Sequence, residues 1–297
     1  MVITSVDVIQ SIIDGILYGS IYALIGVGFT LIFGAMHKLN MAYAASSIAG
    51  AYCGLGISAV LSLNLLVTFF LGPLVGGLIG ILVYLVCFRF IPSREHLGSL
   101  MASIGALFLI DEIIVHETDG SPLNFPELGI FSEAYFLVGE FGFRGDLIFV
   151  LIVSLLAMTS IILMLYRTKY GLAARAVSQQ MNAAILCGIN PHKVNASTFF
   201  LAGVLGGLAG CLAAAAVGVI SPLLILPLTI KGLIATVIGG LGSIKGAIIA
   251  GLLLGGFESL FLLVRGVNER DIYVFLLLFL FLVFKPNGMF GSIIDRD

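Results

Sequence analysis

The sequence predicts an all-α, polytopic membrane protein, and three observations support that fold class. Of the 297 residues, 60% are hydrophobic and only 10% are charged, whereas soluble domains are typically about 45–50% apolar and about 25% charged. Nine apolar stretches approach the roughly 20 residues that a helix needs to cross a bilayer. None of them alternates apolar and polar residues as a barrel strand would. These observations exclude a soluble enzyme, a nucleic-acid-binding protein and a disordered protein.

The stretches differ in how clearly they predict a full span. In chain order they cover roughly 8–34, 41–60, 65–88, 97–115, 145–166, 194–218, 223–241, 246–264 and 271–286. The second is polar enough, through Asn40 and Ser46, to be a broken or re-entrant segment. The seventh carries Lys231 with Pro222 and Pro227 nearby, which favours a short helix plus a half-span. Eight full spans is therefore the nearest alternative to nine.

The basic residues orient these spans. With the N-terminus outside, ten basic residues fall in cytoplasmic loops and three in outer loops. The cytoplasmic ones are Lys38, Arg89, Arg94, Arg167, Lys169, Arg175, Lys193, Lys245, Lys285 and Arg296, and the outer ones are Arg144, Arg265 and Arg270. By the positive-inside rule, nine spans place the N-terminus outside and the C-terminus in the cytoplasm. Since no basic residue precedes Lys38, we expect no cleaved signal peptide.

We expect one transmembrane domain over residues 1–297, without a convincing internal sequence repeat. The outer loop 116–144 divides the chain into two halves and carries five acidic residues against one arginine. Glycine pairs at i, i+4 recur along the spans, as at Gly15/Gly19 and Gly251/Gly255. Such small-residue faces let membrane helices approach closely, so we expect them to be packing surfaces.

The cytoplasmic loop 167–193 contains four basic residues and no acid. It predicts a short helix over 173–186 that ends at Gly188, a typical C-terminal capping residue. Val177, Met181 and Ile185 recur at i, i+4 and i+8 and form a narrow apolar stripe. The pattern fits a helix lying on anionic lipid and equally a helix docked into a groove on a cytosolic partner.

Several stretches of the chain resemble a known family. The runs Gly171-Leu-Ala-Ala-Arg175-Ala and Asn182-Ala-Ala-Ile-Leu-Cys-Gly188 resemble the cytoplasmic loop of ABC importer permeases of the branched-chain amino acid family. Three more stretches agree in order: Gly19-Ser-Ile-Tyr-Ala-Leu24 with the glycines after it, Gly239-Gly-Leu-Gly-Ser-Ile-Lys-Gly246, and Lys285-Pro-Asn-Gly-Met-Phe-Gly291. Together the stretches extend the resemblance over almost the whole chain.

The resemblance implies a coupling helix that seats on an ATPase. The residues it assigns to that contact are Arg175, Val177, Met181, Asn182, Ile185 and Gly188. It also implies two separate ABC ATPase subunits, a second homologous permease in a heterodimer and an extracytoplasmic solute-binding protein. We expect this assembly to lie in the cytoplasmic membrane of a bacterium or archaeon. Its cargo would be branched-chain amino acids or related small amino acids, acids or amides.

The chain is not expected to be an enzyme. It lacks the GxxxxGK[ST] phosphate loop, so ATP and magnesium would be bound by the partner ATPase subunits, with no cofactor in this chain. Its four histidines and four cysteines are not at metal-ligand or disulfide spacing, so we expect no metal site. An ion-coupled secondary transporter of a small organic solute is the alternative function. It would favour paired intramembrane carboxylates, whereas Glu258 stands alone near a span centre.

One segment departs from the family pattern. The family usually has Asn-x-Ala-His-Gly after the first span, where this chain has Asn40-Met-Ala-Tyr43-Ala44. If the segment lines the pathway, a larger or aromatic acid, or an amide, becomes a more plausible solute. Asn40, Tyr43 and Ser46 are candidate pathway residues because polar groups inside a span need partners or water. Hydrogen bonds between helices are the equal alternative.

Two charged residues inside spans complete the candidate pathway set. Glu258 lies within the eighth stretch, where a carboxylate is costly and is by default a functional candidate. Its alternative is a hydrogen bond to a neighbouring helix. Lys231 has three possible roles: snorkelling to the outer headgroups, binding a solute carboxylate, or pairing with Glu258.

Overall fold

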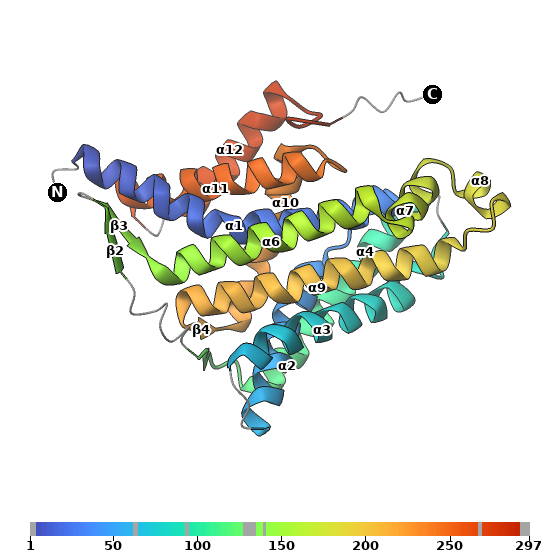
Figure 1. The fold of residues 1–297 in the computed structure, drawn as a ribbon, viewed down its shortest axis with the longest axis horizontal. Coiled ribbons are helices and arrows are strands. Elements are labelled where there is room, and N and C mark those ends of the chain that lie inside the picture. Colours follow the sequence, from blue (N-terminus) through green and yellow to red (C-terminus); the bar gives the residue numbers. More distant parts are fainter. Residues whose placement is uncertain are drawn as a thin grey trace.

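The computed structural model describes residues 4–61, 65–92, 95–126, 135–138, 141–266 and 269–291. Its helices are α1 (Ser5–Met36), α2 (Ala42–Val60), α3 (Leu65–Val83), α4 (His96–Thr118), α6 (Gly145–Arg167), α7 (Lys169–Gln179), α8 (Met181–Leu186), α9 (Pro191–Val217), α10 (Ile225–Gly239), α11 (Ile244–Arg265) and α12 (Arg270–Phe284). The long helices α1, α6, α9 and α11 run side by side along the molecule (Figure 1). The expected all-α, multi-pass architecture is confirmed.

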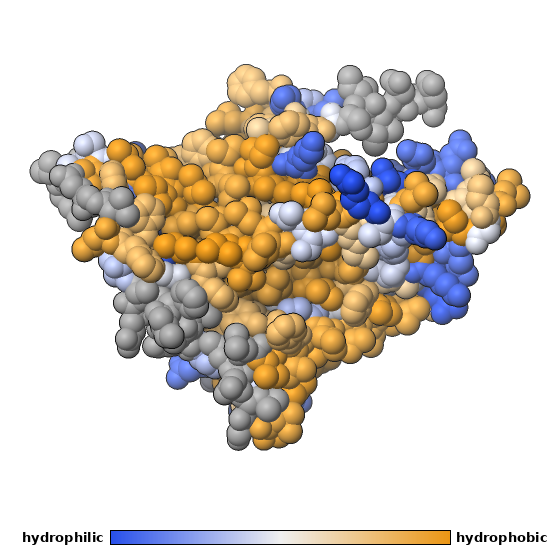
Figure 2. Space-filling view, in the orientation of Figure 1, coloured by the Kyte–Doolittle hydropathy of each residue, from blue (hydrophilic) through white to orange (hydrophobic). Residues whose placement is uncertain are grey.

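Among the described residues, eight helical segments are long and apolar enough to cross a membrane. The ninth expected span, α12, is a helix of only 15 residues. The segment after it returns to the end of α10. There the Met289 and Phe290 amides donate to the carbonyls of Ile238 and Gly239 at 2.7 and 3.1 Å. Apolar residues cover the middle of the visible face, and hydrophilic ones gather around α7 and α8 (Figure 2).

The second stretch is one uninterrupted helix, so the expectation of a broken or re-entrant segment is wrong. Its polar side chains bond within the helix. The hydroxyls of Ser46 and Ser47 both donate to the Tyr43 carbonyl, at 2.5 and 2.9 Å. Their hydrogen bonds are therefore satisfied without opening the backbone. The seventh stretch does not divide into a short helix and a half-span: a 3₁₀ turn at Pro222–Leu224 continues directly into the 15-residue α10, and together they are long enough to cross a membrane.

Glycines set the spacing of the central helices. A Cβ atom on Gly255 of α11 would lie 2.3 Å from the carbonyl oxygen of Gly15 on α1. A Cβ on Gly203 of α9 would lie equally close, 2.3 Å, to the carbonyl oxygen of Gly76 on α3. Backbones this near leave no room for a side chain, which confirms the predicted packing role of the glycine pairs. Helix α1 lies at the centre of the bundle, since 83% of its most apolar 18-residue segment is buried.

The two ends of the bundle differ. One end carries two short antiparallel strand pairs that the sequence did not predict: β1 (Leu123–Asn124) with β4 (Val219–Ile220), and β2 (Tyr135–Val138) with β3 (Phe141–Arg144). The β1–β4 pair ties Leu123 and Asn124 to the segment that follows α9. The acids Glu127, Glu133 and Glu140 of the loop 116–144 lie outside the described residues. The opposite end carries α7 and α8 (Figure 1). Which end faces the cytoplasm stays a prediction from the charges.

Candidate functional site

The loop 167–193 folds into two helices, so the expectation of a single helix over 173–186 is wrong. Helix α7 ends at Gln179, Gln180 adopts an extended conformation with φ −149° and ψ 100°, and α8 begins at Met181. A small apolar cluster buries Ala174 and Val177 from α7 together with Ala184 from α8 and Val194 from α9, so the chain packs against α9 on both sides of the break.

This bend divides the predicted apolar stripe. Val177 is buried in its own chain at 5% exposure, whereas Met181 is 36% and Ile185 50% exposed. Leu186, which the periodicity did not select, is 89% exposed beside them. Gly188 ends the segment as predicted, with φ +80°, and the Ile189 amide donates back to the Ala184 carbonyl at 3.0 Å. The exposed apolar surface is therefore the tip formed by α8, where Asn182 is also exposed.

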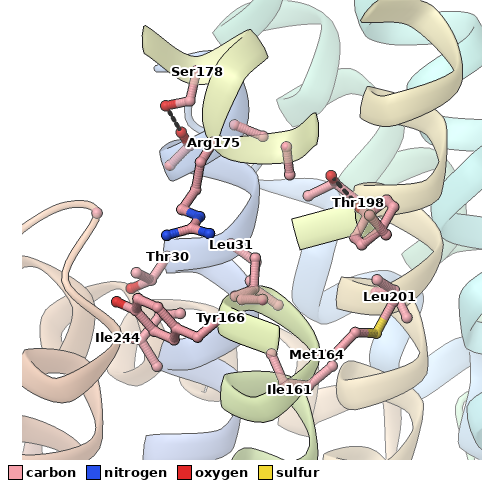
Figure 3. Close-up of a pocket in the computed structure, with 16 residues that line it drawn as sticks. Thr30, Leu31, Ile161, Met164, Tyr166, Arg175, Ser178, Thr198, Leu201 and Ile244 are labelled. Atoms are coloured by element: carbon pink, nitrogen blue, oxygen red, sulfur yellow. Dashed lines mark hydrogen bonds between the residues drawn. The ribbon is translucent and has the colours of Figure 1, made fainter. Parts of the chain in front are cut away.

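Arg175 is directed back toward the bundle. It borders a cavity of about 230 Å³ between α7 and the facing ends of α1, α6 and α9 (Figure 3). Its guanidinium lies 5.4 Å from the centre of the Tyr166 ring, and its Nε donates to the Gly171 carbonyl at 3.3 Å. Nearby, the Ser178 hydroxyl donates to the Gly34 carbonyl of α1. Helix α7 is thus tied directly to the central helix.

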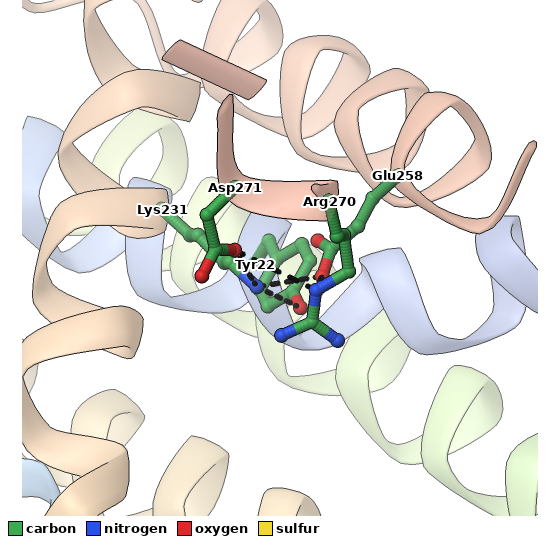
Figure 4. Close-up of polar contacts among 5 residues, drawn as sticks. All are labelled: Tyr22, Lys231, Glu258, Arg270 and Asp271. Carbon is green, nitrogen blue, oxygen red and sulfur yellow. Dashed lines mark hydrogen bonds and ion pairs between the residues drawn. The ribbon is translucent and has the colours of Figure 1, made fainter. Parts of the chain in front are cut away.

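The other end of the bundle contains a buried ion network. Lys231 of α10 and Glu258 of α11 pair at 2.6 Å, which confirms one of the three roles predicted for the lysine (Figure 4). Arg270 and Asp271, at the start of α12, join them: Arg270 Nε lies 3.1 Å from the same Glu258 oxygen, and Lys231 lies 3.6 Å from Asp271. The Lys231 ammonium also reaches the Tyr22 hydroxyl at 3.4 Å.

This network borders a cavity of about 630 Å³. The polar and charged residues that line it are Asp14, Tyr18, Tyr22, Arg144, Lys231, Glu258, Ser259 and Arg270. Sequence reasoning found only Lys231 and Glu258. Arg144 and Arg270 read as ordinary outer-loop charges, because no spacing rule relates them to residues far away in the chain. A charged pair opening an otherwise apolar helix, Arg270-Asp271, was the one local signal.

The candidates Asn40, Tyr43 and Ser46 are buried and border none of the cavities described above. Asn40 caps α2, since its Oδ1 accepts the Ala42 amide at 3.1 Å. The Tyr43 ring packs edge-on against Phe29, with centroids 4.9 Å apart. It occupies space that glycine leaves open, because a Cβ on Gly28 would lie within 1.9 Å of the Tyr43 hydroxyl. Their place in a pathway stays a prediction.

Comparisons with known proteins agree with this geometry. The profile of the family described as "Branched-chain amino acid transport system / permease component" matches residues 11–284. The chain is 30% identical to the high-affinity branched-chain amino acid transport system permease protein BraD of Pseudomonas aeruginosa, over 95% of each chain. It is 28% identical to the corresponding LivH protein of Salmonella typhimurium, again over 95% of each.

An archaeal relative is similar as well. The probable branched-chain amino acid transport permease protein LivH of Methanocaldococcus jannaschii is 30% identical over 84% of this chain and 80% of its own. The family model covers the chain from within α1 to the end of α12. The protein therefore belongs to the branched-chain amino acid transport system permease family.

Proposed function

We propose that the chain is a permease subunit of an ATP-driven ABC importer in the cytoplasmic membrane of a bacterium or archaeon. The observation that carries the proposal is the α7–α8 segment. It presents exposed Met181, Ile185 and Leu186 at one end of an otherwise membrane-spanning bundle. Its loop is basic and without acid. An exposed apolar tip with a basic surround suits docking into a groove of a cytosolic partner.

The partner that this proposal assigns to α8 is one of two separate ATPase subunits. The sequence has no phosphate-binding loop, so ATP and magnesium would be held by those subunits, and this chain would be neither an enzyme nor a cofactor protein. Movement at α8 would pass to α7 and then to α1 through the Ser178–Gly34 hydrogen bond. Because α1 packs backbone to backbone on α11, the shift would extend along the bundle. Transport is then an exchange between two packings.

The remaining partners are proposed from the family resemblance. We propose a heterodimer with a second homologous permease, and a solute-binding protein that docks at the end holding β2 and β3. The cargo is proposed to be a branched-chain amino acid or a related small amino acid, acid or amide. If the segment that holds Tyr43-Ala44 in place of the usual His-Gly lines the pathway, a larger or aromatic acid, or an amide, is favoured within this range.

Reconstitution tests this function against the secondary-transporter alternative. The chain would be placed in liposomes alone, and separately with its ATPase subunits, second permease and solute-binding protein. We expect uptake of labelled amino acids only from the complete assembly, and only with ATP inside the compartment that holds the ATPase. Uptake by the chain alone, driven by a sodium or proton gradient, would overturn the proposal.

A further inference from the structure

We propose that the cavity bordered by Lys231, Glu258 and Arg270 is a binding site for the zwitterionic head of an α-amino acid. This inference rests on the proposed function, because it assigns the transported solute a binding site inside this chain. The cavity of about 630 Å³ lies within the range of about 300–1,000 Å³ that is typical of ligand pockets. The site would recognise the carboxylate and the ammonium of the solute through protein side chains of the opposite charge.

The first argument is the burial of both signs of charge at one place. The Lys231 and Glu258 side chains are only 6% and 7% exposed. Removing two charges from water is unfavourable unless each is well paired, and two apolar residues of similar size would hold α10 and α11 together at least as well. Charged groups inside a membrane protein commonly mark a solute or ion pathway.

The second argument is an unsatisfied oxygen. Glu258 directs Oε1 at both Lys231 and Arg270, while its Oε2 is buried and has no hydrogen-bond partner among the described residues. Buried carboxylate oxygens are nearly always hydrogen-bonded, so this one is available to a donor that enters the cavity. An ammonium group supplies such donors. Asp14 lines the same cavity and adds a second negative charge near it.

The third argument concerns the carboxylate of the solute. Arg270 contacts Glu258 and Asp271 through Nε, and Figure 4 shows its two terminal nitrogens pointing away from the other four side chains. A guanidinium has a planar fork of N–H donors that matches a carboxylate in bidentate geometry. Arg144 borders the cavity from the end of β3, where its Nε and one terminal nitrogen already donate to Asp146. Arg270 thus supplies the donors for a carboxylate, with Glu258 close by for the ammonium.

The fourth argument concerns selectivity. Apolar side chains and two tyrosine rings complete the cavity, namely Leu147, Val217, Leu228, Leu262, Tyr18 and Tyr22. They suit an aliphatic or aromatic side chain. A zwitterion brings no net charge into the network, whereas a simple amine or acid would leave one buried charge without its partner. The site should therefore prefer an intact amino acid to an analogue that lacks either charged group.

The test uses the permease–ATPase complex without its solute-binding protein, in detergent or nanodiscs. Binding of labelled leucine and phenylalanine is measured in competition with 4-methylpentanoate, which lacks the ammonium, and isopentylamine, which lacks the carboxylate. We expect both amino acids to bind and both analogues to compete at least tenfold more weakly. Glu258→Gln should weaken amino acid binding at least tenfold and reduce the preference over 4-methylpentanoate. Glu112→Gln, an exposed carboxylate of α4, is the matched control and should change neither quantity.

A second variant covers the case in which Glu258→Gln does not assemble. Leu262→Trp enlarges a cavity-lining side chain that takes no part in the ion network, and it should weaken phenylalanine binding more than alanine binding. Wild-type binding and selectivity in the assembled variants would overturn the inference while leaving the proposed function intact. Failure of the complete wild-type assembly to import any amino acid would instead overturn the proposed function.

Discussion

At the scale of single residues, the packing of a large side chain inside the bundle depends on where the neighbouring helices carry glycine. Tyr43 is 1% exposed, and its hydroxyl has no hydrogen-bond partner among the described residues. The ring is held by shape, since Gly28 and Gly206 leave the space that it fills. A tyrosine at this position therefore requires glycine on both neighbouring helices. The departure from the family pattern at Tyr43 is thus a packing feature as well as a candidate determinant of solute choice.

We expect Gly28→Ala to destabilise the protein, because the added Cβ would meet the Tyr43 hydroxyl and ring at 1.9 and 2.3 Å. Overpacking of this kind typically costs about 1–3 kcal/mol. The unfolding temperature in detergent should fall by several degrees. Tyr43→Phe is the control, since it removes only an unpaired hydroxyl and should leave stability unchanged or slightly higher. Equal unfolding temperatures for Gly28→Ala and the wild type would contradict this account.

At the scale of helices, the contact between α1 and α11 depends on glycine faces in both partners. Gly15 and Gly19 of α1 lie against Gly251 and Gly255 of α11. The pairs come from opposite ends of the sequence, yet the i, i+4 spacing alone was enough to predict a packing face on each helix. What the spacing did not predict was the partner, because each glycine face is compatible with every other.

Gly255→Ala should destabilise this contact. The new Cβ would lie 2.3 Å from the Gly15 oxygen and 2.4 Å from the Gly19 Cα, and backbone atoms cannot rotate away. A loss of about 1–3 kcal/mol is expected, measured as a lower unfolding temperature. Gly105→Ala in α4 is the matched control, because nothing lies within 4 Å of its Cβ position. There, alanine should be neutral or stabilising by up to about 1 kcal/mol. A similar loss in both variants would count against backbone contact as the cause.

The α8 helix supports a prediction about assembly. Met181→Asp places a charge on the exposed apolar tip, and we expect at least tenfold less ATPase subunit to co-purify with the chain. Phe136→Asp is the control, because Phe136 is 54% exposed on β2 at the opposite end of the bundle. If both variants are folded, as judged by size-exclusion chromatography, and both co-purify normally with the ATPase subunit, then α8 does not contact the ATPase.

At the scale of the whole molecule, the bundle has two distinct ends, and the distribution of basic residues predicts that the end with α7 and α8 faces the cytoplasm. Cys187 is exposed directly after α8. In a variant that keeps Cys187 as the only cysteine, a membrane-impermeant maleimide should label inverted membrane vesicles and not intact cells. A cysteine introduced at Phe136 should show the reverse. Labelling of Cys187 from outside intact cells would invert the proposed topology.

The parts of the molecule that sequence reasoning missed share a physical cause. It found the spans, the packing glycines, Gly188 as a helix end, and Lys231 with Glu258, since each has a local signature in composition or spacing. It missed the break at Gln180, because the local pattern does not mark it: Ala174, Val177 and Ala184 would lie on one face of an unbroken helix as well. It also missed the roles of Arg144 and Arg270, because side chains that meet around a cavity are related only through the packing of several helices.

The sequence by itself determined that this chain crosses a membrane many times, that its basic residues gather on one side, and that one basic loop is exposed. Those properties follow from the local cost of placing polar and charged groups in hydrocarbon, which each segment incurs on its own. The tertiary structure alone decided which helices touch, how the loop bends into α7 and α8, and which charges meet. Those outcomes depend on the shapes of surfaces that come from distant segments. Lys231, Glu258 and Arg270 enclose one cavity only because α10, α11 and the start of α12 pack together around it.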